Sequence, residues 1–297
     1  DNGYHLYKYI REKHPEINVF FVLTDDSPDK DKVLNLGKHY IKRNTFKHFM
    51  YFILSEKLIS THLHGAAPNA KACKPFLKFV PPKKHILLKH GVTKDNFIFN
   101  DKFLDLLVCV SKLEIECLKN SSEKVKNSIQ ILGFCRFDNL IHRPSSEKFI
   151  LIMPTFRLWL EDISRLPNCD KLFRDDPYFI HWNGLLNDME LIDEIEKRNL
   201  KIIFYPHYRI QKYLHNFSSC SKNVIIAGNK DFDIQDLLTR ASLMITDFSS
   251  VFFDFAYMRK PVIYYQFDKE TYRKSHYQQG PFVYERNGFG PVFEQQS

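Results

Sequence analysis

The stretch ASLMITDFSSVFFDFAYMRKPVIYY, residues 241–265, carries the pattern that decides the fold. An apolar run at 243–246 predicts a buried strand, and residues 249–258 have apolar side chains at helical spacing. A second strand is expected at 261–265. A strand, a short turn and a helix in this order form the repeating unit of a parallel α/β sheet.

The turn within this stretch is a candidate phosphate site. We expect the helix to open near Ser249, so that its free N–H groups and its dipole lie at the carboxyl edge of the sheet. The hydroxyls of Ser249 and Ser250 lie beside those groups, and Asp254, one turn further on, could accept from ribose hydroxyls. The alternative is purely structural, with Asp247 or Ser249 capping the helix.

The same alternation continues through the rest of the chain. Strand-like runs occur at 17–24, 57–61, 85–89, 105–110, 128–132, 148–153, 200–205 and 223–227, and helical spacing at 45–56, 111–119, 185–198 and 233–241. This pattern predicts an α/β protein with parallel sheets in two Rossmann-like halves that face a central cleft. Polar residues cluster at 137–148, so we place the link there and expect domains at 1–142 and 143–297.

Composition limits the possible functions. The chain has 297 residues, of which 44% are hydrophobic and 26% charged, which excludes a disordered or fibrous protein. Its net charge of +8 favours anionic partners: nucleotides, nucleic acid, anionic lipid or a polyanionic polymer. Its six cysteines lack zinc-site spacing, so we expect reduced thiols and no bound metal. Charges interrupt every long apolar run, so we expect no membrane span.

Three further strand ends carry polar side chains. Proline and His207 follow the run at 200–205, where an imidazole could bind a pyrophosphate oxygen or act on a leaving group. Thr155 and Arg157 follow the run at 148–153, and a guanidinium matches phosphate geometry. His90 precedes a glycine after the run at 85–89 and is a candidate general base. Each of these residues also fits a structural role in a loop.

Two more features are open to two interpretations. The strand at 128–132 leaves through Gly133 toward Arg136 and Asp138. This pair could meet substrate, or it could bridge the domains as an ion pair. The segment 64–94 is rich in lysine and aromatic residues and could bind an anionic membrane or polymer, or could be a solvated face. Its lysines are Lys71, Lys74, Lys78, Lys83, Lys84, Lys89 and Lys94.

Several motifs occur in an order that resembles one family. They are DNG at 1–3, KHG at 89–91, ILGFCRFD at 131–138, MPTFR at 153–157, YPHY at 205–208 and MITDFSSVFFDFAYMRKPVIYY at 244–265. In this order they are similar to the CDP-glycerol glycerophosphotransferases, the polymerases and primases of teichoic acids and related capsules.

The resemblance implies a GT-B-like fold with an acceptor-side N-terminal domain and a CDP-donor-binding C-terminal domain. It implies transfer of a polyol phosphate from CDP-glycerol or CDP-ribitol to a hydroxyl of a growing anionic polymer or glycan, with release of CMP. It also implies a bacterial cell-envelope role at the inner face of the cytoplasmic membrane and no nucleic acid partner. Mg²⁺ is compatible with such a reaction, but the sequence carries no sign of a dedicated site.

The resemblance also assigns roles to residues. His90 matches the base that acts on the acceptor hydroxyl, and His207 matches the histidine at the donor phosphates. The donor-binding group comprises Thr155, Arg157, Thr246, Ser249, Ser250 and Asp254, with Gly133 and Arg136, and the acceptor-side cations are Lys83, Lys84 and Lys94. We further expect the chain to be an excerpt of a larger capsule polymerase.

Two other classes remain alternatives. A GT-B glycosyltransferase using a sugar nucleotide would share the phosphate site but would form a glycosidic bond. A basic binder of nucleic acid or acidic polymer would need neither histidine.

Overall fold

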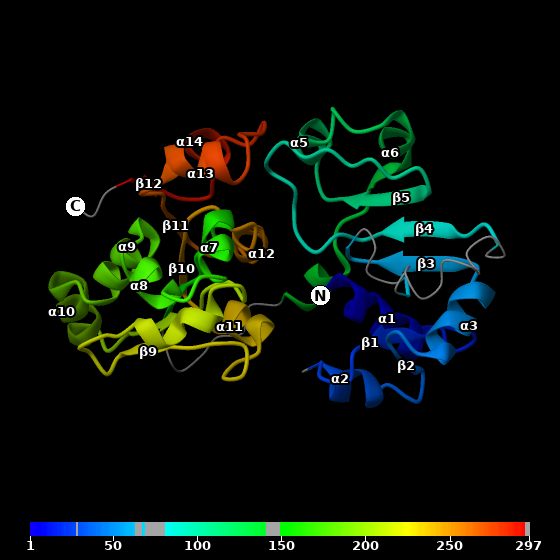
Figure 1. Cartoon of the computed structure of the whole chain (residues 1–297), viewed down its shortest axis with the longest axis horizontal. Helices are drawn as coiled ribbons and strands as arrows, with labels where there is room; N and C mark the ends of the chain where they lie inside the picture. Colours follow the sequence, from blue (N-terminus) through cyan, green and yellow to red (C-terminus); the bar gives the residue numbers. More distant parts are fainter. Residues whose placement is uncertain (28, 63–66, 69–80, 141–148, 295–297) are drawn as a thin grey trace. The chain divides into compact units, whose positions relative to one another are not determined.

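A computed structural model describes residues 1–27, 29–62, 67–68, 81–140 and 149–294 (Figure 1). The chain divides into two compact units. The first comprises Asp1–Thr93 and Phe97–Asn139, and the second comprises Lys94–Asn96 and Leu140–Ser297. The boundary expected between residues 142 and 143 lies outside the described residues, and the cleft expected between the halves stays a prediction.

The first unit is built on a parallel sheet in the order β3-β4-β5-β6. These strands are β3 (Lys57–Ser60), β4 (Lys84–Leu87), β5 (Leu104–Cys109) and β6 (Ile129–Ile131). β1 (Phe21–Leu23) and β2 (Tyr40–Lys42) form a separate parallel pair. The helices are α1 (Asn2–Lys13), α2 (Lys30–Leu34), α3 (Phe46–Leu54), α5 (Lys112–Cys117) and α6 (Glu123–Ser128), with a 3₁₀ turn η2 (Cys135–Asn139).

The second unit has a parallel sheet in the order β12-β11-β10-β7-β8-β9. Its strands are β7 (Phe149–Ile152), β8 (Lys201–Phe204), β9 (Val224–Ile226), β10 (Leu243–Thr246), β11 (Val262–Tyr265) and β12 (Val292–Phe293). From β7 the chain builds the sheet outward through β8 and β9, then returns to add β10 on the other side of β7. This is the Rossmann order, and its switch point lies between β7 and β10, where such sheets bind ligands.

Short helices connect these strands (Figure 1). They are α7 (Leu158–Ile163), α8 (Cys169–Arg174), α9 (Pro177–Leu186), α10 (Met189–Lys197), α11 (Ile234–Arg240), α12 (Phe252–Tyr257), α13 (Lys269–Ser275) and α14 (Tyr284–Asn287), with a 3₁₀ turn η3 (Gln211–Asn216). In the described part of the chain, none of the helices has the length and apolarity that crossing a bilayer requires.

The sequence pattern and the structure agree best where the strands are buried. Each expected strand overlaps a strand of the structure, whereas β2 and β12 are additional. The helix expected at 185–198 begins later, at Met189, because the Asp188 carboxylate accepts from the Leu191 N–H, at 2.8 Å, and caps it there.

The second unit includes three residues, Lys94–Asn96, that interrupt the sequence of the first unit. Asp95 pairs with Arg273 on α13, with Oδ1 and Nη1 2.5 Å apart, and the Asn96 amide donates to the Gln279 carbonyl at 2.7 Å. Gly280 packs so closely on this segment that a Cβ would lie 2.5 Å from the Lys94 carbonyl oxygen. The segment Lys94–Asn96 is therefore an integral part of the second unit.

Aromatic side chains fill the core of the second unit. Phe204, on β8, is fully buried and packs against Phe217, with ring centroids 4.8 Å apart, and against Trp182 on α9. Phe173 stacks on Tyr213 at 4.1 Å. These side chains are closely packed and buried, so removing one ring leaves a cavity.

We expect Phe204→Ala to lower the free energy of unfolding of the second unit by about 3–5 kcal/mol, because both transfer and cavity terms are lost. Urea unfolding followed by tryptophan fluorescence measures this change, since Trp159 and Trp182 both lie in the second unit. The control is Ile180→Ala, at a side chain 54% exposed. Equal losses in the two variants would contradict this account of the core.

Candidate functional site

The loops after β7 and β10 are joined at the switch point of the second sheet. The Thr155 N–H donates to Asp247 Oδ1 at 2.8 Å, and the Thr246 hydroxyl donates to the Met153 carbonyl at 2.6 Å. Thr155 and Thr246, two of the predicted donor-side residues, therefore lie at one junction.

Arg157 is the centre of this junction. Its side chain is fully buried, Nε donates to Asp268 Oδ2 at 2.6 Å, and Nη2 donates to Asp268 Oδ1 at 2.9 Å. Nη2 also lies 2.8 Å from Asp247 Oδ2, and Nη1 donates to the Thr155 carbonyl at 2.8 Å. Burial alone would lower the pKa of this guanidinium, but the charges of Asp247 and Asp268 outweigh it and raise the pKa.

These contacts correct the roles expected of Arg157 and Thr246. The guanidinium is sealed from solvent with its N–H groups directed at carboxylates and carbonyls, so it offers no donor to a phosphate. The Thr246 hydroxyl is fully buried and gives its single proton to Met153. The contacts of both residues hold the loops in place and argue against the expected ligand roles.

The helix after β10 also differs from the expectation. α12 begins at Phe252, because residues 250–254 first form tight turns in which the Phe253 N–H donates to the Ser250 carbonyl at 3.2 Å. Asp247 does not cap the helix, since its side chain accepts from Thr155 and from its neighbour Phe248. Ser249 and Ser250 thus lie in a turn ahead of a six-residue helix.

Hydroxyl groups remain available at this junction. Ser249 and Ser250 are half-buried, and Ser249 Oγ accepts from the Val251 N–H at 3.4 Å, which leaves its proton for a ligand. The buried Thr155 Oγ1 has no hydrogen-bond partner within the described part of the chain. Asp254 is only 4% exposed, so its burial argues against the expected ribose contact.

His207 belongs to the same edge of the sheet. Its N–H donates to the Pro154 carbonyl at 3.2 Å, which ties the loop after β8 to the loop after β7. Its ring stacks on Phe156 with centroids 4.7 Å apart, and Nδ1 accepts from the Arg209 N–H at 3.4 Å. In the neutral ring the proton therefore resides on Nε2.

The sequence did not identify His276, which contacts Phe156 edge-on at 4.7 Å. Its Nδ1 accepts from the Leu158 N–H at 3.2 Å, and Nε2 is buried with no partner among the described residues. Burial, together with the charges of Arg157 and Lys94, lowers the pKa of this histidine to about 3. The imidazole is therefore neutral at physiological pH and carries its proton on Nε2.

In the first unit, His90 follows β4 with its side chain at the surface. Desolvation by the surrounding chain lowers the pKa of His90, and the charges of His62, Arg136 and Lys89 act in the same direction. A neutral imidazole that reaches the surface meets the requirement for a general base.

The backbone around His90 is fixed by the two sequence motifs DNG and ILGFCRFD. The Asn2 amide donates to the Lys89 carbonyl at 2.7 Å, and Lys89 has a left-handed φ of 57°. Arg136 Nη1 donates to the His90 carbonyl at 3.0 Å, and the Arg136 N–H donates to Asn2 Oδ1 at 3.2 Å. Gly133 supplies a φ of 82°, and a Cβ there would meet open space.

Gly133 and Arg136 therefore group with His90 in the first unit, not with the hydroxyl-bearing loops of the second. Their expected contact with the nucleotide stays a prediction. In the structure Arg136 braces the turn that carries His90, and Gly133 forms the turn after β6.

The three acceptor-side lysines have different surroundings. Lys83 Nζ donates to the carbonyls of Ile53 and Ser55, at 2.9 and 2.6 Å, at the end of α3. Lys94 is 5% exposed and forms an ion pair with Asp95. These contacts argue against polyanion binding by Lys83 and Lys94. Lys84 has a side chain 71% exposed and lies 3.4 Å from Asp105, so it can still meet an anion.

Lys71, Lys74 and Lys78 lie outside the described residues. Among the residues that are described, no cluster of three histidine, cysteine or acidic side chains could hold a metal ion.

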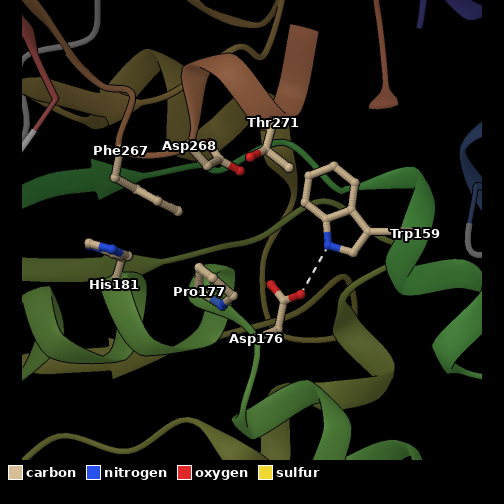
Figure 2. Close-up of a pocket in the computed structure, with 7 residues that line it drawn as sticks. All are labelled: Trp159, Asp176, Pro177, His181, Phe267, Asp268 and Thr271. Atoms are coloured by element: carbon tan, nitrogen blue, oxygen red, sulfur yellow. Dashed lines mark hydrogen bonds between the residues drawn. The ribbon is translucent and has the colours of Figure 1, made fainter. Parts of the chain in front are cut away.

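A cavity of about 240 Å³ lies beside Asp268 in the second unit (Figure 2). Its lining is aromatic and acidic, and Trp159 Nε1 donates to Asp176 Oδ2 across it at 3.0 Å. The lining residues are Trp159, Asp176, Pro177, His181, Phe267, Asp268 and Thr271. The sequence analysis identified none of them as candidate site residues.

Comparison with known proteins gives three findings. A family model described as CDP-glycerol:poly(glycerophosphate) glycerophosphotransferase matches residues 1–297. The minor teichoic acid biosynthesis protein GgaB of Bacillus subtilis is 34% identical over 99% of this chain and 33% of its own length. A teichoic acid poly(glycerol phosphate) polymerase of Staphylococcus epidermidis is 22% identical over 92% of this chain and 39% of its own length.

Solved structures show the same fold. The wall teichoic acid polymerase TagF matches with a TM-score of 0.66 and 18% identity, over 99% of this chain and 74% of that chain. A putative UDP-N-acetylglucosamine 2-epimerase from Listeria monocytogenes matches with a TM-score of 0.53 and 13% identity, over 89% of this chain and 75% of that chain. These likenesses confirm the predicted GT-B-like α/β fold class.

We expect Arg157→Met to lower the free energy of unfolding by about 3–5 kcal/mol, because it leaves Asp247 and Asp268 buried without their cation. Urea unfolding measures the loss. The control Arg165→Met removes an exposed ion pair with Asp162 and should cost less than about 1 kcal/mol. Adding Asp268→Asn to Arg157→Met should recover part of the loss, and an additive further loss would contradict the pairing.

We expect His276 to make the folded chain less stable as pH falls from about 6.5 toward 3. The ordinary pKa of 6.5 falls to about 3 on folding, so in this window the unfolded chain binds a proton that the folded chain does not. His276→Gln can still accept from Leu158 but does not titrate, so its stability should depend less steeply on pH. Urea midpoints between pH 7 and 4.5 test this, with the exposed His215→Gln as the control.

Proposed function

The chain belongs to the CDP-glycerol:poly(glycerophosphate) glycerophosphotransferase family, and we propose that it transfers glycerol phosphate from CDP-glycerol to a polymer hydroxyl, releasing CMP. The acceptor we propose is a growing teichoic-acid-like or capsular chain, in keeping with the names of GgaB and the poly(glycerol phosphate) polymerases. The chain spans about a third of the length of these two relatives, so the activity is proposed for the protein as a whole.

The observation that carries the proposal is the placement of His90, whose side chain lies at the surface while Arg136 Nη1 donates to its carbonyl at 3.0 Å. The backbone is thus fixed, and the imidazole is presented at the surface of the first unit. A neutral imidazole nitrogen in that position is suited to take the proton of an incoming hydroxyl.

The reaction we propose balances without a cofactor. The acceptor oxygen attacks the phosphorus that carries glycerol, and a new P–O bond forms there. The bond from that phosphorus to the oxygen shared with CMP breaks, and CMP leaves with this oxygen. The hydroxyl proton goes to His90, and Mg²⁺ bound to the donor diphosphate is compatible with every step.

On the donor side, neutral hydrogen-bond donors would meet the diphosphate. We propose Thr155, Ser249, Ser250 and His207 for this role, because they lie on loops at the switch-point edge of a Rossmann sheet. Arg157 would act behind them by fixing the loops. Donors held in position before the reaction stabilise developing charge without reorganisation.

The finer parts of the proposal concern partners and place. A net charge of +8 and the exposed Lys84 suit an anionic polymer and a peripheral position at the inner face of the cell membrane. We propose that the protein has no nucleic acid partner. CDP-ribitol is the other candidate donor, since a ribitol-phosphate polymerase of Staphylococcus aureus is 32% identical over 77 residues.

Calorimetric titration with CDP-glycerol, CDP-ribitol, CMP and UDP-glucose tests the donor. We expect one CDP-polyol to bind selectively and Ser250→Ala to weaken that binding roughly tenfold, as loss of one hydrogen bond to a charged group predicts. The control is Ser164→Ala, whose hydroxyl donates to the Glu161 carbonyl.

The same preparation tests the chemistry. CMP release from the preferred donor should fall about 10²–10⁴-fold in His90→Ala while donor binding persists. Preference for UDP-glucose would move the chain to the glycosyltransferase class, and undiminished turnover by His90→Ala would remove the proposed base.

A further inference from the structure

A second histidine lies against the proposed base. The rings of His62 and His90 are parallel within 5°, with centroids 4.7 Å apart. His62 lies two residues beyond the end of β3, which neighbours β4 in the sheet. We call His62 and His90 the histidine pair.

A hydrogen-bond chain fixes the tautomer of His62. The Thr61 hydroxyl donates to Asp1 Oδ2 at 3.0 Å, and the same oxygen lies 3.2 Å from His62 Nδ1. A hydroxyl has a single proton, and the Thr61 hydroxyl uses it in the hydrogen bond to Asp1. The Thr61 oxygen must therefore accept a hydrogen bond from His62 Nδ1–H. In the neutral ring, Nε2 therefore carries a lone pair.

Two neighbouring residues hold His62. The Thr61 hydroxyl accepts from its ring, and the Ser60 hydroxyl donates to its carbonyl at 2.8 Å. Both histidines reach the surface, and the His62 ring cannot turn without breaking its contact to Thr61 or its stacking on His90.

We propose that His62 is a positioning residue for His90, which it covers on one face and whose ring orientation it restricts by stacking. This inference rests on the proposed function of His90 as the base. Stacking on a flat partner restricts rotation of the His90 ring, and a second imidazole opposes a second positive charge beside it.

Other charges also face His90. Arg136 reaches it from η2, and Lys89 precedes it in the turn after β4. Glu114 on α5 pairs with Lys89, and Asp1 ahead of α1 lies behind the Thr61 hydroxyl. The contribution of His62 must therefore be measured with these groups unchanged.

Three variants separate the possible effects. His62→Phe keeps a flat ring but removes the charge and the bond to Thr61. His62→Ala removes the ring as well. Thr61→Val removes the hydroxyl that orients His62 but keeps both imidazole rings. The control is His14→Phe, an exposed histidine of the same unit paired with Glu16.

The first readout is NMR titration of His90 in the free chain, with its signal assigned by its loss in His90→Gln. We expect the pKa of His90 to rise by about 0.5–1 unit in His62→Phe and His62→Ala, because a like charge is removed. Thr61→Val should shift the pKa of His90 less than either His62 variant does. His14→Phe should leave the pKa of His90 unchanged.

The second readout is the pH profile of CMP release. We expect kcat to fall about tenfold or more in His62→Ala and by a smaller factor in His62→Phe. The acid limb of the pH profile should shift in the same direction as the pKa of His90. A His90 titration and a kcat profile unchanged in His62→Ala would overturn the inference. If wild type releases no CMP while the His90 titration still shifts, the proposed function fails and the histidine pair stands.

Discussion

A buried cation between two carboxylates is the constraint on which the second unit depends. Arg157 follows β7, Asp247 follows β10 and Asp268 follows β11, so one guanidinium joins three strand ends. Aromatic rings of Tyr178, Phe248 and Tyr272 enclose it at 5.0–5.4 Å and keep water out. A charge in such surroundings is tolerated only while every partner stays in place. The loops that present Thr155, Ser249 and Ser250 are therefore held as one piece.

The first unit orients its histidine by different means. The turn that carries His90 is held from distant motifs: the Asn2 amide donates to the Lys89 carbonyl, and the His62 ring stacks on the His90 ring. Arg136 contributes a charge, but it donates to the His90 carbonyl and lies over Phe134 at 4.7 Å. Several modest contacts thus hold a ring that reaches the surface.

The sequence predicted the strands, the parallel α/β class and most of the loops that carry polar groups, because buried strands are apolar runs and their ends are marked by proline, glycine and hydroxyl residues. It could not predict which way a side chain turns at a strand end. Arg157 has the spacing of a phosphate ligand, yet its partner Asp268 is 111 residues away and draws it inward. His276 went unnoticed for the same reason, since its partner Leu158 is 118 residues away, and His62 went unnoticed because it stacks on His90, which follows another strand.

The segment Lys94–Asn96 has a consequence for biosynthesis. Asp95 pairs with Arg273, which lies 178 residues later in the chain, and Asn96 bonds Gln279, which lies 183 residues later. At ribosomal rates of about 5–20 residues per second, roughly 10–35 seconds separate the synthesis of the two sides of this contact. During that time residues 97–139 of the first unit have already been synthesised. Lys94–Asn96, just before them, cannot form its contacts until Arg273 and Gln279 have been made. The second unit is therefore completed by a piece of chain that is among the earlier parts to be synthesised.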